Sequence, residues 1–259
     1  MTAYERQQYL LDKLRKEACL RVSEVAGILN VSESTIRNDL NFLEDEGRIR
    51  RIHGGAVLTD HMNMGGNSFS NRYSQNIDEK RAIAREAAKR VNDGDSILLD
   101  ASSTAYCLAC ELSEHKALRV ITNGFEIAKE LARNTSNNVI LIGGVVNFNT
   151  SSVTGLLSEK IIEDLYVQKA FISCSGFTLE RGMTELNLDE AQLKRKMIGS
   201  TQQLFAVVDS SKFGKEDLTP IAKLENIDKL YTDARISPEW KERLLKVGID
   251  IIICNQELH

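Results

Sequence analysis

The chain has 259 residues, of which 42% are hydrophobic and 27% charged, a balance that excludes a wholly disordered protein. Its formal net charge of -4 excludes a surface that is basic throughout, although one segment can still carry a local basic face. No apolar run approaches the roughly 18 residues of a membrane-spanning helix, the N-terminus lacks a secretory signal, and the five cysteines are scattered and odd in number. We therefore expect a cytoplasmic protein without a disulfide framework.

Residues 1–58 begin with the pattern of a small helical domain. Tyr9, Leu10 and Leu14 lie at helical spacing and predict a first amphipathic helix. Ser23 is positioned to cap a second helix. The buried side of this second helix is expected to carry four apolar residues, Val25, Ala26, Ile28 and Leu29.

A third helix and a basic hairpin follow. Ser32 is positioned to cap this helix, which ends at Gly47, and its apolar stripe consists of Ile36, Leu40 and Leu43. Residues 48–57 form a short alternating segment with a Gly-Gly turn, which predicts a two-stranded hairpin. Two helices joined by a tight turn and followed by a basic hairpin are typical of a winged helix-turn-helix.

The outward side of the third helix and the hairpin, or wing, supply candidate DNA contacts. Hydroxyls, one arginine and one amide on the helix suit base edges and phosphates, and the wing arginines suit a phosphate track. The candidates are Ser34, Thr35, Arg37, Asn38, Arg48, Arg50, Arg51 and His53. The acidic run at 44–46 is expected to point away from a DNA backbone. A small protein-interaction module is the alternative, but the cap, stripe, Gly stop and basic wing occur in the order of a DNA-binding domain.

Residues 59–76 are polar and contain several Asn, Ser and Gly, which predicts a linker. His61, Met62 and Met64 lie within it, but one His without a second ligand pair is weak evidence for a metal site. We therefore expect no metal there, and we assign residues 77–259 to a second domain.

Helices and strands alternate from residue 78 onward. Helices are predicted at 78–92, 102–112, 125–133, 158–165, 189–200 and 237–247, and strands at 96–99, 119–121, 139–142, 169–172, 204–208, 229–232 and 249–253. Continuous apolar strands between helices are typical of a mostly parallel sheet covered on both faces. The expected fold class is α/β, with an N-terminal winged helix-turn-helix and a larger α/β domain.

Ligands of such sheets bind beyond the carboxyl ends of the strands, where this chain has several polar loops. These loops contain Asp100 with the hydroxyls of Ser102, Ser103 and Thr104, then Asn123, then Gly143 and Gly144, and later Asp209 with Lys212. Hydroxyls at a helix N-terminus together with a lysine suit a phosphorylated sugar or polyol. Each loop alone also fits an ordinary cap or turn, and neither a P-loop nor a dinucleotide fingerprint occurs, so we expect no cofactor.

Two residue pairs have ordinary structural explanations. Glu190 and Lys194 are four residues apart on a predicted helix, and spacing alone favours a surface ion pair over a role in a pocket. Cys107 and Cys110 lie within a predicted helix without a second ligand pair, which favours buried thiols over zinc or redox chemistry.

The chain resembles the DeoR family of bacterial transcriptional regulators. Its Ser32-x-x-Thr35-Ile36-Arg37-Asn38-Asp39-Leu40 is similar to that family's recognition helix, and the segments 51–56, 99–104 and 209–213 are similar to further family motifs. Many members have Gly where this chain has Ser102. The resemblance covers almost the whole chain.

This resemblance implies a sensor domain with the fold of ribose-5-phosphate isomerase and an effector that is a phosphorylated sugar. It places the phosphate on the hydroxyls after Asp100 and implies a pocket formed by Asp100, Ser102, Ser103, Thr104, Asn123, Gly143, Gly144, Glu190, Lys194 and Lys212. Members generally repress sugar-catabolic operons as dimers or tetramers, so the expected partners are double-stranded operator DNA, the effector and further copies of the chain, with no membrane. The alternative is an enzyme, a sugar-phosphate isomerase with an appended helical module, which the DNA-binding pattern makes less favoured.

Overall fold

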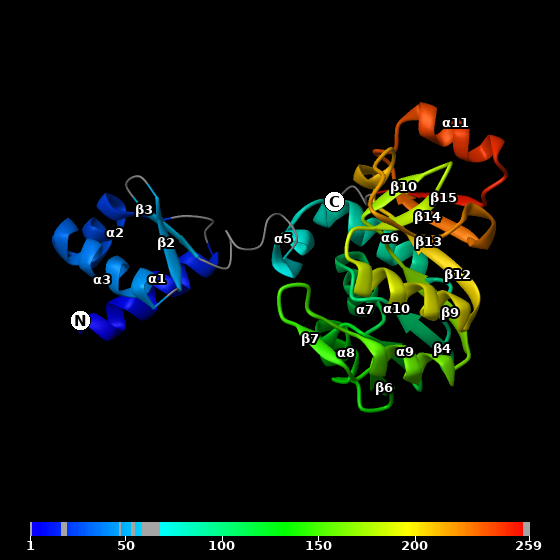
Figure 1. Cartoon of the computed structure of the whole chain (residues 1–259), viewed down its shortest axis with the longest axis horizontal. Coiled ribbons are helices and arrows are strands. Elements are labelled where there is room, and N and C mark those ends of the chain that lie inside the picture. Colours follow the sequence, from blue (N-terminus) through cyan, green and yellow to red (C-terminus); the bar gives the residue numbers. More distant parts are fainter. Residues whose placement is uncertain (1, 17–19, 47, 53–54, 59–67, 256–259) are drawn as a thin grey trace. The chain divides into compact units, whose positions relative to one another are not determined.

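The computed structural model describes residues 2–16, 20–46, 48–52, 55–58 and 68–255 and divides the chain into two compact units, Met1–Ser68 and Phe69–His259 (Figure 1). The candidates His53, His61, Met62 and Met64 lie outside the described residues. No helix within these ranges is both long enough and apolar enough to span a membrane.

The smaller unit has the predicted winged helix-turn-helix plan. Its elements are α1 (Ala3–Lys16), β1 (Leu20–Arg21), α2 (Val22–Leu29), α3 (Glu33–Asp45), β2 (Ile49–Ile52) and β3 (Gly55–Leu58). The strands pair antiparallel in the order β1-β3-β2. Buried residues of all three helices form one core with the strands, and they include the predicted stripe of Ile36, Leu40 and Leu43.

Two expectations for α2 are wrong. The helix begins at Val22 with Arg21 in the cap position, so Ser23 lies in its first turn and caps nothing. Val22, Val25 and Ala26 are the buried residues, and Ile28 is 54% exposed because it falls on the opposite side of the helix. Leu29 packs against the core while remaining partly exposed.

Glycine is required at the start of β3. A Cβ atom built on Gly55 would lie 2.0 Å from the backbone oxygen of Leu20, far inside van der Waals contact. β1 and β3 pair at this point, with Arg21 opposite Gly55, so the bare backbone lets β1 approach the wing. Gly55 therefore serves the packing of β1 against β3.

The larger unit is built on the predicted parallel sheet. Seven strands lie in the order β15-β14-β12-β9-β4-β5-β6, and every neighbouring pair is parallel. Their bounds are β4 (Ser96–Leu99), β5 (Arg119–Thr122), β6 (Asn138–Leu141), β9 (Val167–Ile172), β12 (Thr201–Val207), β14 (Lys229–Asp233) and β15 (Ile251–Cys254).

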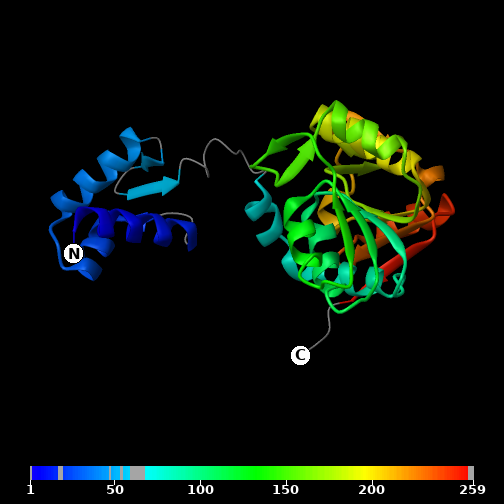
Figure 2. The same cartoon turned by 90° about the horizontal axis from the view of Figure 1, so that it is seen from below.

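Helices cover both faces of this sheet, as the apolar strands predict (Figures 1 and 2). One face packs against α6 (Ile77–Ala88), α7 (Ser103–Glu111) and α8 (Phe125–Leu131). The other packs against α9 (Leu156–Glu163), α10 (Leu188–Gly199) and α11 (Pro238–Lys246). The fold class predicted from the sequence is thus confirmed.

The remaining elements lie around the ends of the sheet. They are the antiparallel ribbon of β7 (Val145–Asn147) and β8 (Ser152–Thr154), the antiparallel sheet of β10 (Gly176–Thr178), β11 (Gly182–Glu185) and β13 (Thr219–Ala222), and the short 3-10 helices η1 (Ser210–Lys212) and η2 (Leu224–Asn226). The sequence pattern predicts no regular structure in these segments.

The predicted linker at 59–76 is too long. Residues Phe69–Ser74 form helix α5, which belongs to the larger unit. The rings of Phe69 and Tyr73 pack edge-on against Tyr106 of α7, with centroid separations of 5.5 and 5.3 Å. This aromatic cluster explains why a polar segment folds onto the larger unit.

Candidate DNA-binding surface and candidate effector site

The N-terminus of α3 is closed by a small hydroxyl cluster. Ser32 Oγ accepts a hydrogen bond from the backbone N of Thr35 at 3.1 Å, and it lies 2.7 Å from Ser34 Oγ and 2.8 Å from Thr35 Oγ1. This confirms the predicted cap. Arg37 and Asn38 are exposed on the same helix, and the Arg37 guanidinium lies 2.6 Å from the Glu33 carboxylate. An exposed pair of this kind is worth at most about 1 kcal/mol, so Arg37 can exchange Glu33 for another anion.

A buried ion pair fixes α3 to α1. Asp39 is 5% exposed and accepts from Arg6 Nε at 2.7 Å and from Arg6 Nη2 at 3.3 Å. Asp39 lies on the inward side of α3, between the buried residues Ile36 and Leu40. The pair therefore orients the helix so that Arg37 and Asn38 face outward. The sequence pattern gave no role to Asp39, because an isolated acid within an apolar stripe does not identify its partner.

The wing is braced against the end of α3. Arg51 donates from its guanidinium to Asn41 Oδ1 at 2.5 Å and from its backbone N to Glu44 Oε1 at 2.8 Å. Arg48 lies 3.7 Å from Glu46. Glu44 and Glu46 of the acidic run thus contact the wing directly. That the acidic run points away from the DNA backbone stays a prediction. The side chain of Arg50 lies outside the described residues.

At the carboxyl edge of the larger sheet, the loop after β4 is held by buried polar groups. Asp100 is fully buried and accepts a hydrogen bond from Ser102 Oγ at 2.7 Å. Ser102 also caps α7, since its Oγ accepts from the Ala105 backbone N at 3.1 Å. Ser103 and Thr104 lie in the first turn of α7 and are buried, at 5% and 2% exposed. Serine at position 102 therefore has two bonds that a glycine could not make.

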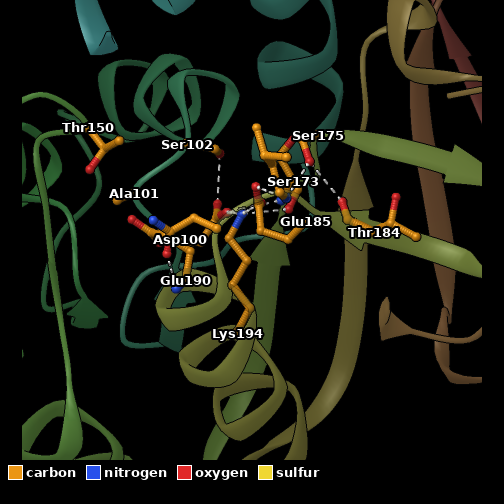
Figure 3. A network of polar contacts seen from close by, with 12 residues as sticks. Asp100, Ala101, Ser102, Thr150, Ser173, Ser175, Thr184, Glu185, Glu190 and Lys194 are labelled. Carbon is orange, nitrogen blue, oxygen red and sulfur yellow. Dashed lines mark hydrogen bonds and ion pairs between the residues drawn. The ribbon is translucent and has the colours of Figure 1, made fainter. Parts of the chain in front are cut away.

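Lys194 of α10 lies at the centre of a charged network (Figure 3). Its ammonium lies 3.0 Å from Asp100 Oδ2 and 2.6 Å from Glu185 Oε2, and it donates to the backbone oxygen of Ser173 at 3.1 Å. Burial disfavours the charged ammonium, but Glu185 and Asp100 outweigh burial and hold the pKa of Lys194 above its ordinary value. Burial likewise opposes ionisation of Glu185, and Lys194 outweighs it and lowers the pKa of that carboxyl group.

Glu190 is the second buried carboxyl group on α10. It is 9% exposed and accepts a hydrogen bond from Ser152 Oγ, which lies 2.7 Å from Thr150 Oγ1. Burial raises the pKa of Glu190, although Lys194 and Ser152 oppose the shift. Spacing alone favoured a surface ion pair between Glu190 and Lys194, which is wrong. Both side chains point inward, and each has partners from other elements (Figure 3).

Asn123 joins the loops after β4 and β5 to the ribbon β7–β8. This fully buried side chain accepts from the Ala101 backbone N at 2.9 Å and donates to the Val153 backbone oxygen at 3.2 Å. Gly143 and Gly144 lie at the start of the ribbon, where the Gly143 oxygen accepts from Ser158 Oγ of α9 at 2.7 Å. A Cβ atom on Gly144 would lie 2.4 Å from Ser158 Oγ and from the Thr154 oxygen. Asn123 therefore fixes the backbone next to Asp100 and Ser152, and Gly143 is fixed to α9.

A second group of charges follows β12. Lys212 ends η1 and is partly exposed, and Asp209 is 1% exposed and accepts from Asn76 Nδ2 at 3.2 Å. Lys80 of α6 is 4% exposed and donates to the backbone oxygens of Arg72 and Gln75. Burial lowers the pKa of Lys80, and Lys212 adds to this shift while Asp209 opposes it.

Several residues of the site do not appear among the sequence candidates. Glu185, Ser152 and Lys80 come from β11, β8 and α6, and only the fold brings them to the strand ends. Cys107 is buried and Cys110 partly buried, and both thiols are free. The described residues contain no cluster with the composition of a metal site.

Comparison with known proteins gives family matches over both units. The model of the DeoR-like helix-turn-helix domain matches residues 6–62, and that of the DeoR C terminal sensor domain matches residues 75–234. The HTH-type transcriptional regulator GolR of Listeria innocua is 41% identical over 98% of this chain and 99% of its own length. The lactose phosphotransferase system repressor of Streptococcus mutans is 33% identical over 91% of this chain and 94% of its own length.

Solved structures give weaker matches. Ribose 5-phosphate isomerase A from Methanocaldococcus jannaschii is 22% identical with a TM-score of 0.39, covering 55% of this chain and 56% of that chain. Similarity at this level carries no information on activity. The two family matches and the full-length relatives show that the chain belongs to the DeoR family of transcriptional regulators.

Proposed function

We propose that this regulator represses a sugar-catabolic operon and that a phosphorylated sugar, bound at the carboxyl edge of the seven-stranded sheet, controls its binding to operator DNA. The observation that carries the proposal is the buried charged network of Asp100, Glu185, Glu190 and Lys194 beside the N-terminus of α7. Buried charges at strand ends are typical of a ligand site in this fold class. The relative named as the lactose phosphotransferase system repressor of Streptococcus mutans supports a sugar-related role.

The DNA-binding part of the proposal assigns α3 to the major groove. Arg37 and Asn38 read bases together with Ser34 and Thr35, and Arg48, Arg50, Arg51 and His53 of the wing hold the backbone. The support is the exposure of Arg37 and Asn38 on a helix whose opposite side is fixed by Asp39. Two copies of this unit would bind a two-fold operator in a dimer or tetramer of the chain, in the cytoplasm.

The effector part assigns the phosphate to the first turn of α7. Ser102 caps this turn through its hydrogen bond with the Ala105 backbone N. The hydroxyls of Ser103 and Thr104 make no side-chain hydrogen bond within residues 68–255. A helix N-terminus favours an anion, and Lys212 adds a positive charge. Asp100, Glu190 and Lys194 bind sugar hydroxyls, and Asn123, Gly143 and Gly144 shape the wall. We add Lys80 as a further source of positive charge beside Lys212.

A route for the signal starts at Glu190. Its partner Ser152 contacts Thr150, whose backbone oxygen accepts from Arg72 of α5 at 3.0 Å. The backbone N of Phe69, the first residue of α5, donates to the Asn149 oxygen at 2.8 Å. A sugar hydroxyl that replaces Ser152 at Glu190 would therefore move the ribbon loop and α5, the first element after residues 59–67. An effector acts in this way only if it binds one arrangement more tightly than the other.

The test is a gel shift with the promoter region of an adjacent sugar operon and a panel of sugar phosphates. We expect specific retardation that one sugar phosphate changes and the unphosphorylated sugar does not. A thermal shift on the same panel identifies the ligand, because binding raises stability by mass action. Retardation without any response to the panel would contradict the effector assignment. Isomerase turnover of pentose or hexose phosphates, with no DNA binding, would instead establish the enzyme alternative.

A further inference from the structure

An exposed apolar surface lies on one side of the larger unit, which we call the 140–161 surface. It consists of eight residues from one continuous stretch of chain, each at least 39% exposed: Ile140, Leu141, Val145, Val146, Phe148, Leu156, Leu157 and Ile161. Phe148 and Leu156 are 77% and 74% exposed, which is unusual for side chains of this size. Scattered single apolar residues on a surface are ordinary, but a contiguous set marks an interaction site.

Three elements and the turn after β7 supply this surface, and a hydrogen bond ties α9 to the segment after β6. β6 is the edge strand of the seven-stranded sheet. In the ribbon, β7 is mostly exposed, whereas its partner β8 is buried. α9 turns Ser158 and Ile162 inward and Leu157 and Ile161 outward. The bond from Ser158 to Gly143 ties α9 to the end of β6. Figure 1 shows β6, β7 and α9 along the same side of the unit, and Figure 2 views that side.

The surface is large enough for a stable interface. Eight side chains at these exposures present on the order of 700 Å² of apolar area. The largest apolar patch of a typical monomer is about 300–600 Å². One partner contributes about 800 Å² to a standard protein interface, so the 140–161 surface with a polar rim reaches that size.

The edge strand adds a second property. β6 reads Asn138-Val139-Ile140-Leu141, which contains no charge and no proline, and its outer backbone edge pairs with no strand within 68–255. Edge strands that remain free in solution usually carry charges, prolines or bulges that prevent pairing with another strand. The absence of these features in β6 favours an edge that is covered in the assembled protein.

We propose that a second copy of this chain covers the 140–161 surface, with two sensor units related by a two-fold axis. This rests on the proposed function, since a repressor that binds a two-fold operator needs two winged units in one molecule. A two-fold contact requires a surface that complements itself. The 140–161 surface does so, because its apolar residues pair with like residues and its exposed charges on α9 have both signs, Lys160 and Glu163.

The test is the mass of the full chain in solution, measured by sedimentation equilibrium for Leu157→Asp and for the matched control Leu218→Asp. Both leucines are 66% exposed, but Leu218 lies outside the surface. We expect the wild-type chain to be a dimer or tetramer. We expect Leu157→Asp to self-associate at least 100-fold more weakly, because a two-fold interface contains this leucine once from each copy. The control is expected to associate like the wild type.

A second variant, Val146→Lys on the ribbon, keeps the test decisive if Leu157→Asp does not fold, as judged by circular dichroism. A monomeric wild type would overturn the proposal, and so would equal association of Leu157→Asp, Val146→Lys and Leu218→Asp. These results are separate from the proposed function, which is judged by the gel shift of the wild-type chain. A dimer that persists in both surface variants and still retards the operator would refute this surface alone.

Discussion

Arg37 is the residue whose removal tests the DNA-binding surface. Its side chain is 52% exposed and pairs with Glu33 at 2.6 Å, so its loss leaves the core of the smaller unit intact. We expect Arg37→Ala to weaken operator binding by roughly 5- to 150-fold, the range for one arginine contact to a base. Arg181→Ala is the matched control, since Arg181 is also 52% exposed and paired with a glutamate, Glu216, but lies in the larger unit. Equal affinity of the two variants in a gel shift would count against α3 as the recognition helix.

Lys194 is expected to be essential for the stability of the larger unit. Its loss leaves Asp100 and Glu185 buried without their cation, and breaking a buried pair costs about 3–5 kcal/mol. Lys196→Met on the same helix is the control, because its pair with Glu163 is about half exposed and worth less than about 1 kcal/mol. Urea unfolding of Lys194→Met and Lys196→Met measures the difference. Similar unfolding free energies would mean that the network does not stabilise the fold.

Glu190 and Glu185 are expected to act on stability with opposite pH dependence. The pKa of Glu190 is raised in the folded protein, so its contribution to stability falls as pH rises from the ordinary value of 4.5 through the raised value. The pKa of Glu185 is lowered, so its contribution is present above 4.5 and is lost as pH falls through the lowered value.

Glu190→Gln keeps an oxygen that accepts from Ser152 and removes the titration. We expect the unfolding free energy of Glu190→Gln, relative to the wild type, to increase as pH rises from 4.5 through the raised pKa of Glu190. For Glu185→Gln, the stability deficit relative to the wild type is expected to shrink as pH falls below 4.5. Urea unfolding at a series of pH values gives both differences. Parallel wild-type and Glu190→Gln curves would show that Glu190 titrates normally.

At the scale of elements, helix α5 is expected to couple the effector site to residues 59–67. Arg72 donates to the Thr150 oxygen, and its Nε is buried without a hydrogen-bond partner among the described residues. We expect Arg72→Ala to bind effector within about 3-fold of the wild type while the effector's influence on DNA binding, ordinarily 5- to 150-fold for allosteric proteins, falls toward none.

Arg195→Ala is the control for this prediction, because Arg195 also donates to one backbone oxygen, that of Pro220, at 3.1 Å. Fluorescence anisotropy of labelled operator, with and without effector, measures the influence. If Arg72→Ala responds to effector as strongly as Arg195→Ala does, the signal does not pass through this bond.

The elements also show what the sequence can predict. The strands of the large sheet were predictable because each is a continuous apolar run, as in 96–99 and 204–208. The ribbon β7–β8 and the sheet β10-β11-β13 were not, because their short strands contain no continuous apolar run, and β11 also pairs with the distant strand β13. Helix α5 was missed for a related reason, since its ring partner Tyr106 lies in another helix.

The same distinction holds for the candidate site. Asp100, Ser102 and Asn123 could be predicted because they directly follow strands, where polar loops of a parallel sheet gather. Glu185 and Ser152 could not, because their positions depend on how β11 and β8 fold back over the sheet. Lys194 shows the limit most clearly, since spacing alone matched it with Glu190, whereas the fold places Glu185 and Asp100 around it.

The two units have separate hydrophobic cores, one from α1–α3 with the wing and the other on both faces of the large sheet. We therefore expect two unfolding transitions in calorimetry of the full chain. A sugar phosphate at 100 times its Kd is expected to stabilise the larger unit by about 2.7 kcal/mol and to raise only its transition temperature. Operator DNA is expected to raise the other transition.

The substitutions above assign the two transitions. Lys194→Met lowers the melting temperature of the larger unit, and Gly55→Ala lowers that of the smaller unit, because the added Cβ collides with the backbone oxygen of Leu20. A single transition that shifts as a whole with either ligand would contradict this expectation, because it would mean that both units unfold as one. If each unit has its own transition and effector raises only that of the larger unit, the effector does not stabilise the winged unit itself. It would then act on DNA binding by binding one arrangement of the two-unit chain more tightly than another.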